Sequence, residues 1–414
     1  MTACSVPLRI RTNAFSGRSY YSSYALPART TVLDIDTPYA YTIYKHFRTE
    51  VCSECFNYQS GRRGFLTCRE YGENAGLLFC DAICMDRWIE REGMELVELL
   101  TRLEVRRLKK KGKEREDLRK QVSDEEIEET WSKVAKIERN RKQTRKWSQL
   151  FLDDFEADIA RYVLMALYHH SLEVGQRKEA HFPSSHGVLD LSPEAKDDAK
   201  FGEGSCSWSD FASLQSNGTI QIKLFPELLD NHIRIYQVLK GLFGLHSKPT
   251  TANAFRMNVN GDIQQLAEQD VCQMSTTHPD TAMLSSSQRL AQVITIKNVR
   301  TALGVDPGNS FGIWETPLID ESECLGFAVY PIPSFFNHHC SPNVRKERAG
   351  CQLRFVTTRP VEAGEELCIS YGHVENMGWQ ERQKTLWDGW YFECMCSRCL
   401  ANKEKIENRC NGYP

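Results

Sequence analysis

The 414-residue sequence has no apolar run that approaches the roughly 18 residues of a membrane-spanning helix. It does not begin with an apolar stretch of about 7–15 residues, so we expect no secretory signal and an intracellular protein. It contains no Walker A lysine loop and no G-x-G-x-x-G pattern, so nucleotide binding of those two kinds has no support. Its 52 Lys and Arg against 55 Asp and Glu give no overall basicity that would argue for nucleic acid.

What the sequence does contain is an ordinary globular composition with many cysteines. Apolar residues make up 41% and charged residues 26%, a balance that excludes a wholly disordered chain. The length predicts about two or three domains. Sixteen cysteines in an intracellular protein are expected to be reduced, and clustered thiols then indicate metal sites rather than disulfides.

The strongest metal signal is Cys394-x-Cys396-x2-Cys399. Three thiols so close in the chain cannot all form disulfides with one another. They suit a tetrahedral zinc ion that still needs a fourth ligand, although an exposed chance cluster is the alternative. The candidates for the fourth ligand are Cys340, His338, His339 and Cys410.

A second cluster combines Cys52-x2-Cys55 with Cys80-x3-Cys84. Two such pairs predict a closed structural zinc site with four thiolate ligands. Cys68 lies between the pairs without a partner, so a second zinc ion in this module is not expected. The sequence therefore predicts two zinc ions in all.

A charged segment follows the second cluster. Residues 102–146 hold 17 Lys and Arg and 10 Asp and Glu, a local net charge of +7. We interpret it as a solvated helical hairpin or a partly disordered insertion. The alternative is nuclear import, or contact of residues 102–120 with nucleic acid or an acidic partner.

Hydrophobic periodicity divides the rest of the chain into helical and strand-like parts. Helical spacing recurs over 147–173, 226–243 and 288–303. Two polar segments are expected to be loops, 183–220 and 246–287. Strand-like runs follow at 325–331, 352–358 and 366–371, with a hairpin turn predicted at Ala363-Gly364 between the last two. The pattern predicts one β domain split by a long insertion.

One motif is misleading. Gly308-Asn-Ser310-Phe-Gly312 matches the G-x-S-x-G nucleophile elbow of hydrolases. That elbow needs a strand before the serine and a helix after it. Pro307 precedes the motif closely and Pro317 follows it, in sequence that is poor helix material. A hydrolase is therefore disfavoured.

The segment Asn337-His-His-Cys-Ser-Pro-Asn343 packs two amides, two imidazoles and a thiol directly after Phe335-Phe336. Polar groups this dense beside an apolar stretch need partners, which a polar ligand or a metal can supply. A satisfied structural turn is the alternative.

Here a resemblance becomes specific. NHHCSPN at 337–343 resembles the NHSCxPN motif of SET-domain protein lysine methyltransferases, and GEELCISY at 364–371 resembles their GEELxxxY segment. FECMCSRC at 392–399 resembles their zinc-binding post-SET tail, and NSF at 309–311 resembles the NSF segment of the SET-MYND subfamily. GRSY at 17–20 resembles the GRGL cofactor loop. In that subfamily a MYND zinc finger interrupts the SET domain, where residues 52–84 lie here.

The resemblance implies an α+β fold, namely a split SET β-fold with an inserted MYND-like zinc finger, a long helical insertion and a zinc-binding post-SET tail. The expected parts are an N-terminal SET segment at 7–50, the finger at 51–90, the insertion at 91–303, the core SET domain at 304–375 and the tail at 376–414. The sequence continues for 15 residues after Cys399, so the family's C-terminal helical domain is not expected.

The resemblance also implies roles for individual residues. Tyr371 would be the catalytic tyrosine, and Cys340 the fourth ligand of the tail zinc. S-adenosylmethionine would be bound by Gly17, Arg18, Ser19, Asn309, Asn337, His338, Tyr371 and Phe392. The finger zinc would use Cys52, Cys55, Cys80 and Cys84, and the tail zinc Cys394, Cys396 and Cys399 besides Cys340.

The implied activity is S-adenosylmethionine-dependent methylation of lysine in a histone or another protein, in the nucleus or the cytoplasm. An aromatic channel would favour the neutral amine of the substrate. Trp390, Tyr391, Tyr330 and Phe392 are candidates to line it, with core packing as the alternative for each. Ser19 stands where the family has a second glycine, which puts a Cβ beside the ligand. The rival hypothesis is a non-catalytic SET-MYND adaptor that binds protein partners.

Overall fold

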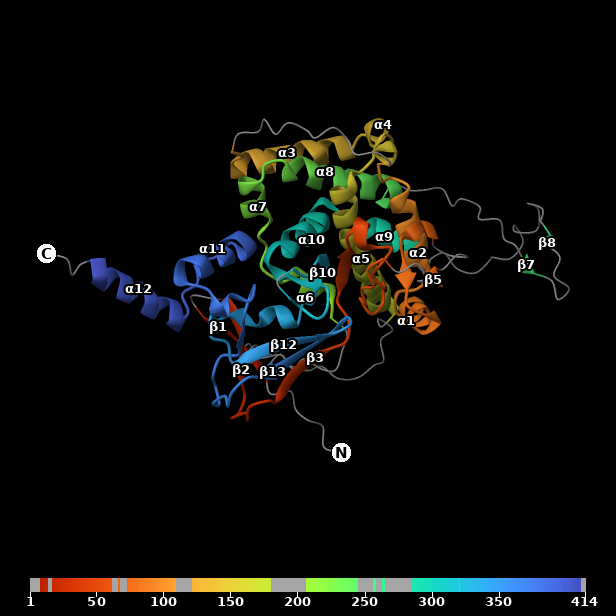
Figure 1. Cartoon of the computed structure of the whole chain (residues 1–414). Coiled ribbons are helices and arrows are strands. Elements are labelled where there is room, and N and C mark those ends of the chain that lie inside the picture. Colours follow the sequence, from red (N-terminus) through yellow and green to blue (C-terminus); the bar gives the residue numbers. More distant parts are fainter. Residues whose placement is uncertain are drawn as a thin grey trace, which may run out of the picture.

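The β-structure of the chain is built jointly by its N-terminal and C-terminal parts, and a helical region lies above it (Figure 1). The structure is a computed structural model that describes residues 8–13, 17–61, 66–67, 73–108, 121–179, 206–244, 256–257, 263–264, 284–319 and 321–410. No helix within these ranges is both long and apolar enough to cross a membrane.

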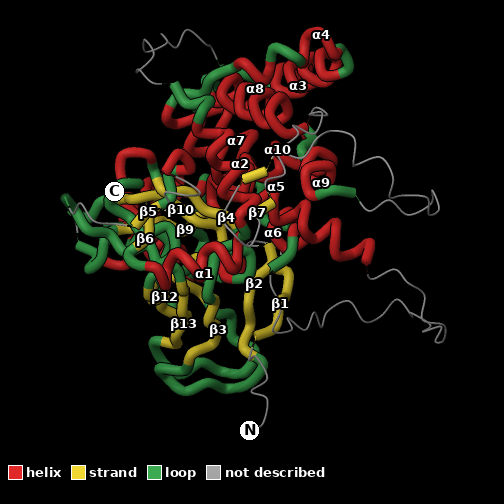
Figure 2. Tube along the Cα trace, turned by 90° about the vertical axis from the view of Figure 1, so that its right-hand side faces the viewer, coloured by secondary structure: helices red, strands yellow, loops and turns green. Residues whose placement is uncertain are grey.

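Two three-stranded antiparallel sheets join distant parts of the sequence (Figure 2). One has the order β4 (Ala40–Ile43), β10 (Cys324–Val329) and β9 (Ser310–Trp314). The other has the order β12 (Val344–Ala349), β13 (Gln352–Thr357) and β3 (Thr31–Ile35). Each sheet therefore contains one strand from before the insertion and two from after it, which confirms the predicted split β-fold.

Shorter strand pairs complete the β-structure. β1 (Leu8–Asn13) and β2 (Gly17–Ser22) form a hairpin, and β11 (Asn337–His338) pairs in parallel with β14 (Cys368–Ile369). The remaining pairs are β5 (Leu66–Thr67) with β6 (Leu78–Phe79) and β7 (Arg256–Met257) with β8 (Ile263–Gln264).

The cysteine-rich module is attached to the β-fold through its helix α1 (Ala82–Glu92). Asp81 caps that helix by accepting a hydrogen bond from the Cys84 backbone N–H at 2.8 Å. Trp88 is fully buried against Phe79, and its indole N–H donates to the Tyr41 hydroxyl at 2.8 Å. Both aromatic rings therefore belong to the core of this module.

Helices fill the insertion and the C-terminal tail. Those of the insertion are α2 (Met94–Glu104), α3 (Asp124–Glu138), α4 (Arg141–Thr144), α5 (Asp154–Glu179), α6 (Trp208–Ala212), α7 (Gly218–Leu224), α8 (Leu228–Leu239), α9 (Ser286–Val293) and α10 (Ile296–Asn309). The tail carries α11 (Trp379–Trp390) and α12 (Ser397–Cys410). Short 3-10 helices lie at 45–47, 73–75, 147–149, 333–335 and 374–376, and a π-helical turn at 240–244. The long helix α5 contacts β4, α8, α9 and α10 and forms the centre of the helical region.

A buried ion cluster ties the N-terminal β-structure to the insertion. Asp158 of α5 accepts hydrogen bonds from the guanidinium groups of Arg48 and Arg107 and from the Lys45 backbone N–H. Glu104 of α2 pairs with the same two arginines and with Arg161. Charges this deep are stable only when paired and hydrogen-bonded, so the cluster fixes how α2 and α5 lie against the β-fold.

Three local expectations were wrong. The helix expected over 147–173 begins only at Asp154, because Asp153 and Glu156 form a reciprocal capping pair, and it passes through Gly175. The loop expected over 183–220 contains α6 and α7 in its described part. Gly364 does lie in a turn, with φ +80°, but β14 pairs with β11 rather than with β13. Residues 183–205 and most of 246–287 lie outside the described residues.

Candidate functional site

The C-terminal cysteine trio meets Cys340 in space. The sulfur atoms of Cys340, Cys394, Cys396 and Cys399 lie within 4.8 Å of one another. Cys340 Sγ is 3.8 Å from Cys394 Sγ and 3.5 Å from Cys399 Sγ. Of the four candidates for the fourth ligand, the structure brings Cys340 to the trio. The His339 imidazole instead lies 3.2 Å from the Ser397 hydroxyl.

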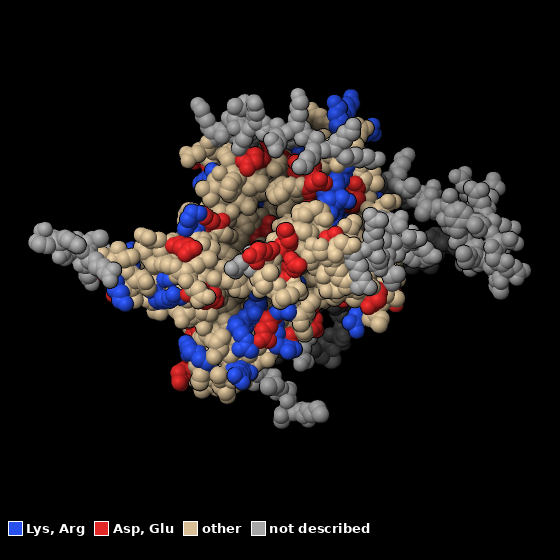
Figure 3. All heavy atoms as spheres, viewed as in Figure 1, with Lys and Arg blue, Asp and Glu red and all other residues tan. Residues whose placement is uncertain are grey.

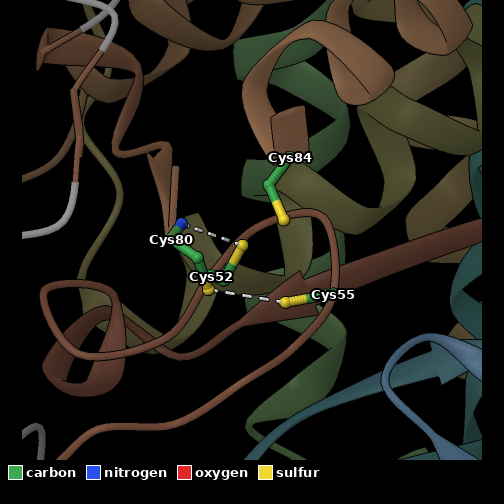
Figure 4. A group of neighbouring side chains, drawn as sticks. All are labelled: Cys52, Cys55, Cys80 and Cys84. Atoms are coloured by element: carbon green, nitrogen blue, oxygen red, sulfur yellow. Dashed lines mark hydrogen bonds between the residues drawn. The ribbon is translucent and has the colours of Figure 1, made fainter. Parts of the chain in front are cut away.

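The N-terminal cluster also closes into one group of four thiols (Figure 4). Cys52, Cys55, Cys80 and Cys84 place their sulfur atoms within 4.8 Å of one another. Cys55 Sγ lies 3.5 Å from Cys80 Sγ, and the Cys80 backbone N–H donates to Cys52 Sγ at 3.4 Å. Two cysteines come from the loop after β4, one follows β6, and one lies in the first turn of α1.

The chemistry of both groups fits zinc. The hydrogen bond from Cys55 lowers the pKa of Cys52 to about 5, whereas burial and the charge of Cys52 raise the pKa of Cys84 to about 12. Four neighbouring thiols therefore cannot all ionise unless a cation compensates their charge. A divalent ion with tetrahedral thiolate coordination supplies that charge, and four protein ligands leave no position for water. Either zinc would act structurally.

Tyr371 lies at the centre of the predicted site. Its hydroxyl donates to the Phe336 carbonyl at 2.7 Å, and its backbone N–H donates to His338 Nδ1 at 2.9 Å. The tyrosine ring lies 5.4 Å from the centroid of Trp390 and 6.2 Å from that of Phe392. Burial raises the pKa of Tyr371 well above its ordinary value, so the phenol stays protonated.

The two motif segments around Tyr371 are joined by the parallel pair β11 and β14. Asn337 lies opposite Cys368, and His338 lies opposite Ile369. The buried Asn343 side chain strengthens this crossing, because it donates to the Glu366 carbonyl at 2.8 Å and accepts from the Cys368 backbone N–H at 2.9 Å. The asparagine motif and the GEELCISY segment therefore lie side by side.

The glycine-containing loop lies beside the same segment, since the Leu367 backbone N–H donates to the Tyr20 carbonyl at 2.8 Å. Gly17 has φ +70°, a conformation that favours glycine. Ser19 is fully buried, and its hydroxyl has no hydrogen-bond partner among the described residues. The hydroxyl of the half-buried Ser370 likewise has none there. Buried hydroxyls without partners are uncommon and fit a site whose polar ligand completes them.

Ser213 and Gln215 contact two of the predicted cofactor residues, and sequence reasoning missed them. The Arg18 guanidinium donates to the Ser213 carbonyl and lies 4.7 Å above the Phe335 ring. The Asn309 amide donates to the Gln215 carbonyl at 2.8 Å. Two predicted cofactor residues are thus attached to one short segment of the insertion. The only local signal was the capping pair of Ser207 and Asp210, which starts α6.

The SET domain family matches residues 87–372, which is more than half of the sequence. This chain belongs to the SET-domain family. The matched range runs through both the insertion and the NHHCSPN and GEELCISY segments.

Curated relatives of this SET-domain protein agree with the SET-MYND resemblance. The potential protein lysine methyltransferase SET6 of Saccharomyces cerevisiae is 25% identical over 431 residues, covering 96% of both chains. A SET and MYND domain-containing protein of Dictyostelium discoideum is 37% identical over 103 residues, a quarter of each chain. The mouse histone-lysine N-methyltransferase SMYD3 is 41% identical over 99 residues, 24% of this chain and 22% of its own.

The structure excludes the hydrolase motif and separates the four aromatic candidates. Ser310 follows helix α10 and begins strand β9, the reverse of the element order that a nucleophile elbow needs. Tyr330 is 2% exposed and donates its hydroxyl to the Cys351 carbonyl, so it packs in the core. Trp390 and Phe392 are the aromatic candidates whose rings contact Tyr371.

Proposed function

We propose that this SET-domain protein is a protein-lysine N-methyltransferase that uses S-adenosylmethionine. The family match and the names of the relatives support the reaction class. The observation that carries the proposal is the position of Tyr371. Its hydroxyl donates a hydrogen bond to the Phe336 carbonyl, and its ring contacts the rings of Trp390 and Phe392.

The residues that would hold S-adenosylmethionine are Gly17, Arg18, Ser19, Asn309, Asn337, His338 and Phe392. When bound, it supplies an electrophilic methyl group on a sulfonium ion. The unpaired hydroxyls of Ser19 and Ser370 offer this polar ligand hydrogen bonds that the protein itself does not satisfy. The side-chain nitrogen of Asn309 already donates to the Gln215 and Val305 carbonyls, so its side-chain oxygen is the group that it would offer to the cofactor.

The chain's own groups are suited to orient a lysine amine and keep it neutral. Aromatic surroundings disfavour an ammonium ion relative to the free amine and so lower the pKa of the substrate lysine. The protonated Tyr371 donates to the Phe336 carbonyl, which leaves its oxygen lone pairs to receive weak C–H···O contacts. Alignment of two reactants in a fixed geometry is the main contribution that the protein makes to such a displacement.

We further propose that the substrate is a lysine side chain of a histone or of another nuclear or cytoplasmic protein. The range 102–120, expected to contact nucleic acid or an acidic partner, falls mostly outside the described residues. Arg102 and Arg107, which are described, are engaged within the protein through the Leu242 carbonyl and the buried ion cluster. A nucleic-acid contact would therefore have to be made by other residues of this range.

Purified protein, labelled S-adenosylmethionine and cell extract test the proposal. Wild-type protein should label one or more proteins, and Tyr371→Phe should lower kcat by at least about tenfold, or about 1.4 kcal/mol. Cofactor affinity should change little, because the hydroxyl acts in the transition state rather than the ground state. Tyr330→Phe, which removes a hydroxyl in the core, is the matched control and should keep its kcat. Zinc-loaded wild-type protein that labels nothing would instead support the adaptor hypothesis.

A further inference from the structure

Strand β12 carries two basic side chains on its inward face. Side chains alternate between the two faces of a strand, so Lys346 and Arg348 lie on the same side. Lys346 is opposite Phe355 and Arg348 is opposite Leu353 in the neighbouring strand. Both apolar partners are buried, which identifies this as the face that packs on the core. The two cations therefore start from the core-facing side of the strand, but the Lys346 side chain reaches solvent and that of Arg348 is half-buried.

The outward face of the same sheet is different, because its cations are paired. Arg345 contacts Glu347 at 2.6 Å, and Arg354 contacts Asp34 at 2.9 Å. Figure 3 shows basic and acidic side chains side by side in the region of β12 and β13. Within the described part of the chain, neither Lys346 nor Arg348 has a carboxylate partner. Their charges are thus left without compensation on a surface where neighbouring charges are balanced.

An aromatic row connects these cations to the proposed catalytic tyrosine. Lys346 Nζ lies 5.2 Å from the Phe311 ring centroid, and Phe311 lies 6.5 Å from Phe355. Phe355 stacks on Phe336 at 4.7 Å, and the Phe336 carbonyl accepts the hydroxyl of Tyr371. The uncompensated charges therefore lie at one end of a row of aromatic rings, buried at Phe355 and Phe336, whose other end bonds to the tyrosine.

The surroundings of Lys346 show that its charge is costly there. The side chain keeps contact with solvent, yet desolvation by the protein around it, together with the charge of Arg348, lowers the pKa of Lys346 to about 8. The Arg348 guanidinium donates to the carbonyls of Trp314 and Gly350 and has donors beyond these two. Trp314 beside it is 40% exposed, so the patch is accessible to another chain.

We infer that Lys346 and Arg348 select substrate segments that carry carboxylates in the sequence around the target lysine. This inference rests on the proposed function, since it names the class of protein segment that the site accepts. An acidic side chain compensates the two cations, whereas a basic one is repelled by both. Charge arrangements of this kind favour one partner and reject the other.

Two peptides test the inference. Each contains a single central lysine in a Gly/Ser background, flanked by Glu and Asp in one and by Arg in the other. Wild-type protein should methylate the acidic peptide with a kcat/KM roughly three- to twentyfold higher, as expected for two partly exposed ion pairs. The preference should shrink in about 1 M salt, where the screening length falls to about 3 Å.

Variants on the two faces of β12 show whether Lys346 and Arg348 cause the preference for the acidic peptide. The double variant Lys346→Glu/Arg348→Glu should reverse the preference toward the Arg-flanked peptide. Lys346→Gln, a milder change, should reduce it and serves if the double variant does not fold. Arg345→Glu, on the outward face of the same strand, should leave the preference unchanged.

The outcomes distinguish this inference from the proposed function. A wild-type ratio near one, or a double variant that keeps the acidic preference, overturns the inference while methyl transfer stands. If wild-type protein methylates nothing, the same peptides with norleucine in place of lysine are compared by fluorescence anisotropy. Tighter binding of the acidic peptide, reduced in Lys346→Gln, would uphold the charge selection without the reaction, and equal binding of the two peptides by wild-type protein would overturn it.

Discussion

Replacement of Cys340 by alanine is the sharpest test of how the C-terminal half of the site is assembled. Cys340 is 54 residues from Cys394 in the sequence but 3.8 Å from it in sulfur-to-sulfur distance. Its thiol is the only member of the tail cluster that comes from the asparagine motif. Cys340→Ala therefore removes the covalent ligand through which a zinc ion would join the motif to the tail.

The size of the effect follows from the ligand count. Structural zinc sites contribute about 10–16 kcal/mol of apparent binding free energy, so one ligand of four represents roughly 2.5–4 kcal/mol. The loss of that share lowers zinc affinity by about a hundredfold or more. The hydrogen bonds of Arg398 to the Cys340 and Glu375 carbonyls remain, so the tail should loosen rather than unfold the whole protein.

Metal analysis after dialysis against a chelator should find two zinc ions per wild-type chain and one per Cys340→Ala chain. Backbone amides of residues 392–406 should exchange hydrogen faster, while those around Cys52 and Cys55 keep their protection. Cys324→Ala, which removes a half-buried thiol outside both clusters, and Cys410→Ala should retain two ions. A Cys340→Ala protein with two zinc ions, or a Cys410→Ala protein with one, would refute the assignment.

Three further perturbations address stability and cofactor binding. Asp158→Asn should lower the free energy of unfolding, measured in urea, by about 3–5 kcal/mol, because it leaves buried arginines without one of their carboxylate partners. Glu129→Gln, at the surface, is the control and should leave that free energy unchanged. Burial opposes the charge of His169, but its hydrogen bond to Glu92 prevails and raises its pKa above 6.5. Its pairing therefore stabilises the fold fully below pH 6.5 and fades as pH rises through the raised pKa, so His169→Gln should lose more stability at about pH 6 than at about pH 9; an equal loss would contradict this. Ser19→Gly should tighten S-adenosylmethionine binding about twofold to fivefold in calorimetry, and weaker binding would contradict it.

The chemistry of the site was predictable from the sequence, because its motifs carry their residues at fixed local spacing. Cysteine spacing predicted two thiolate clusters, and the asparagine motif predicted a dense polar site. Spacing alone left four candidates for one zinc ligand, since the answer depends on which distant segments cross. The contact between the tail and residue 340 decides it, where Arg398 donates to the Cys340 carbonyl, and no local pattern encodes a contact between segments so far apart.

The contribution of the insertion was not predictable for the same reason. Arg18 and Ser213 are 195 residues apart, and the segment between α6 and α7 has neither a long apolar period nor a recognised motif. Short helices are specified mostly by their caps and by tertiary packing, so polar residues such as Ser207 and Asp210 make them resemble loops. Domain boundaries, cofactor contacts and cellular location stay predictions.

His338 explains why the zinc cluster and the proposed catalytic tyrosine form one unit. Its Nδ1 accepts the backbone N–H of Tyr371, and its Nε2 lies 3.2 Å from Cys340 Sγ. One imidazole therefore spans the distance between a zinc ligand and the residue proposed to orient the methyl group. A structural zinc at Cys340 would restrict the histidine ring, and the ring in turn restricts the backbone on which Tyr371 is carried. A zinc ion bound by the tail cluster would on this reasoning influence methyl transfer through the position of one backbone amide, without any contact with the reactants.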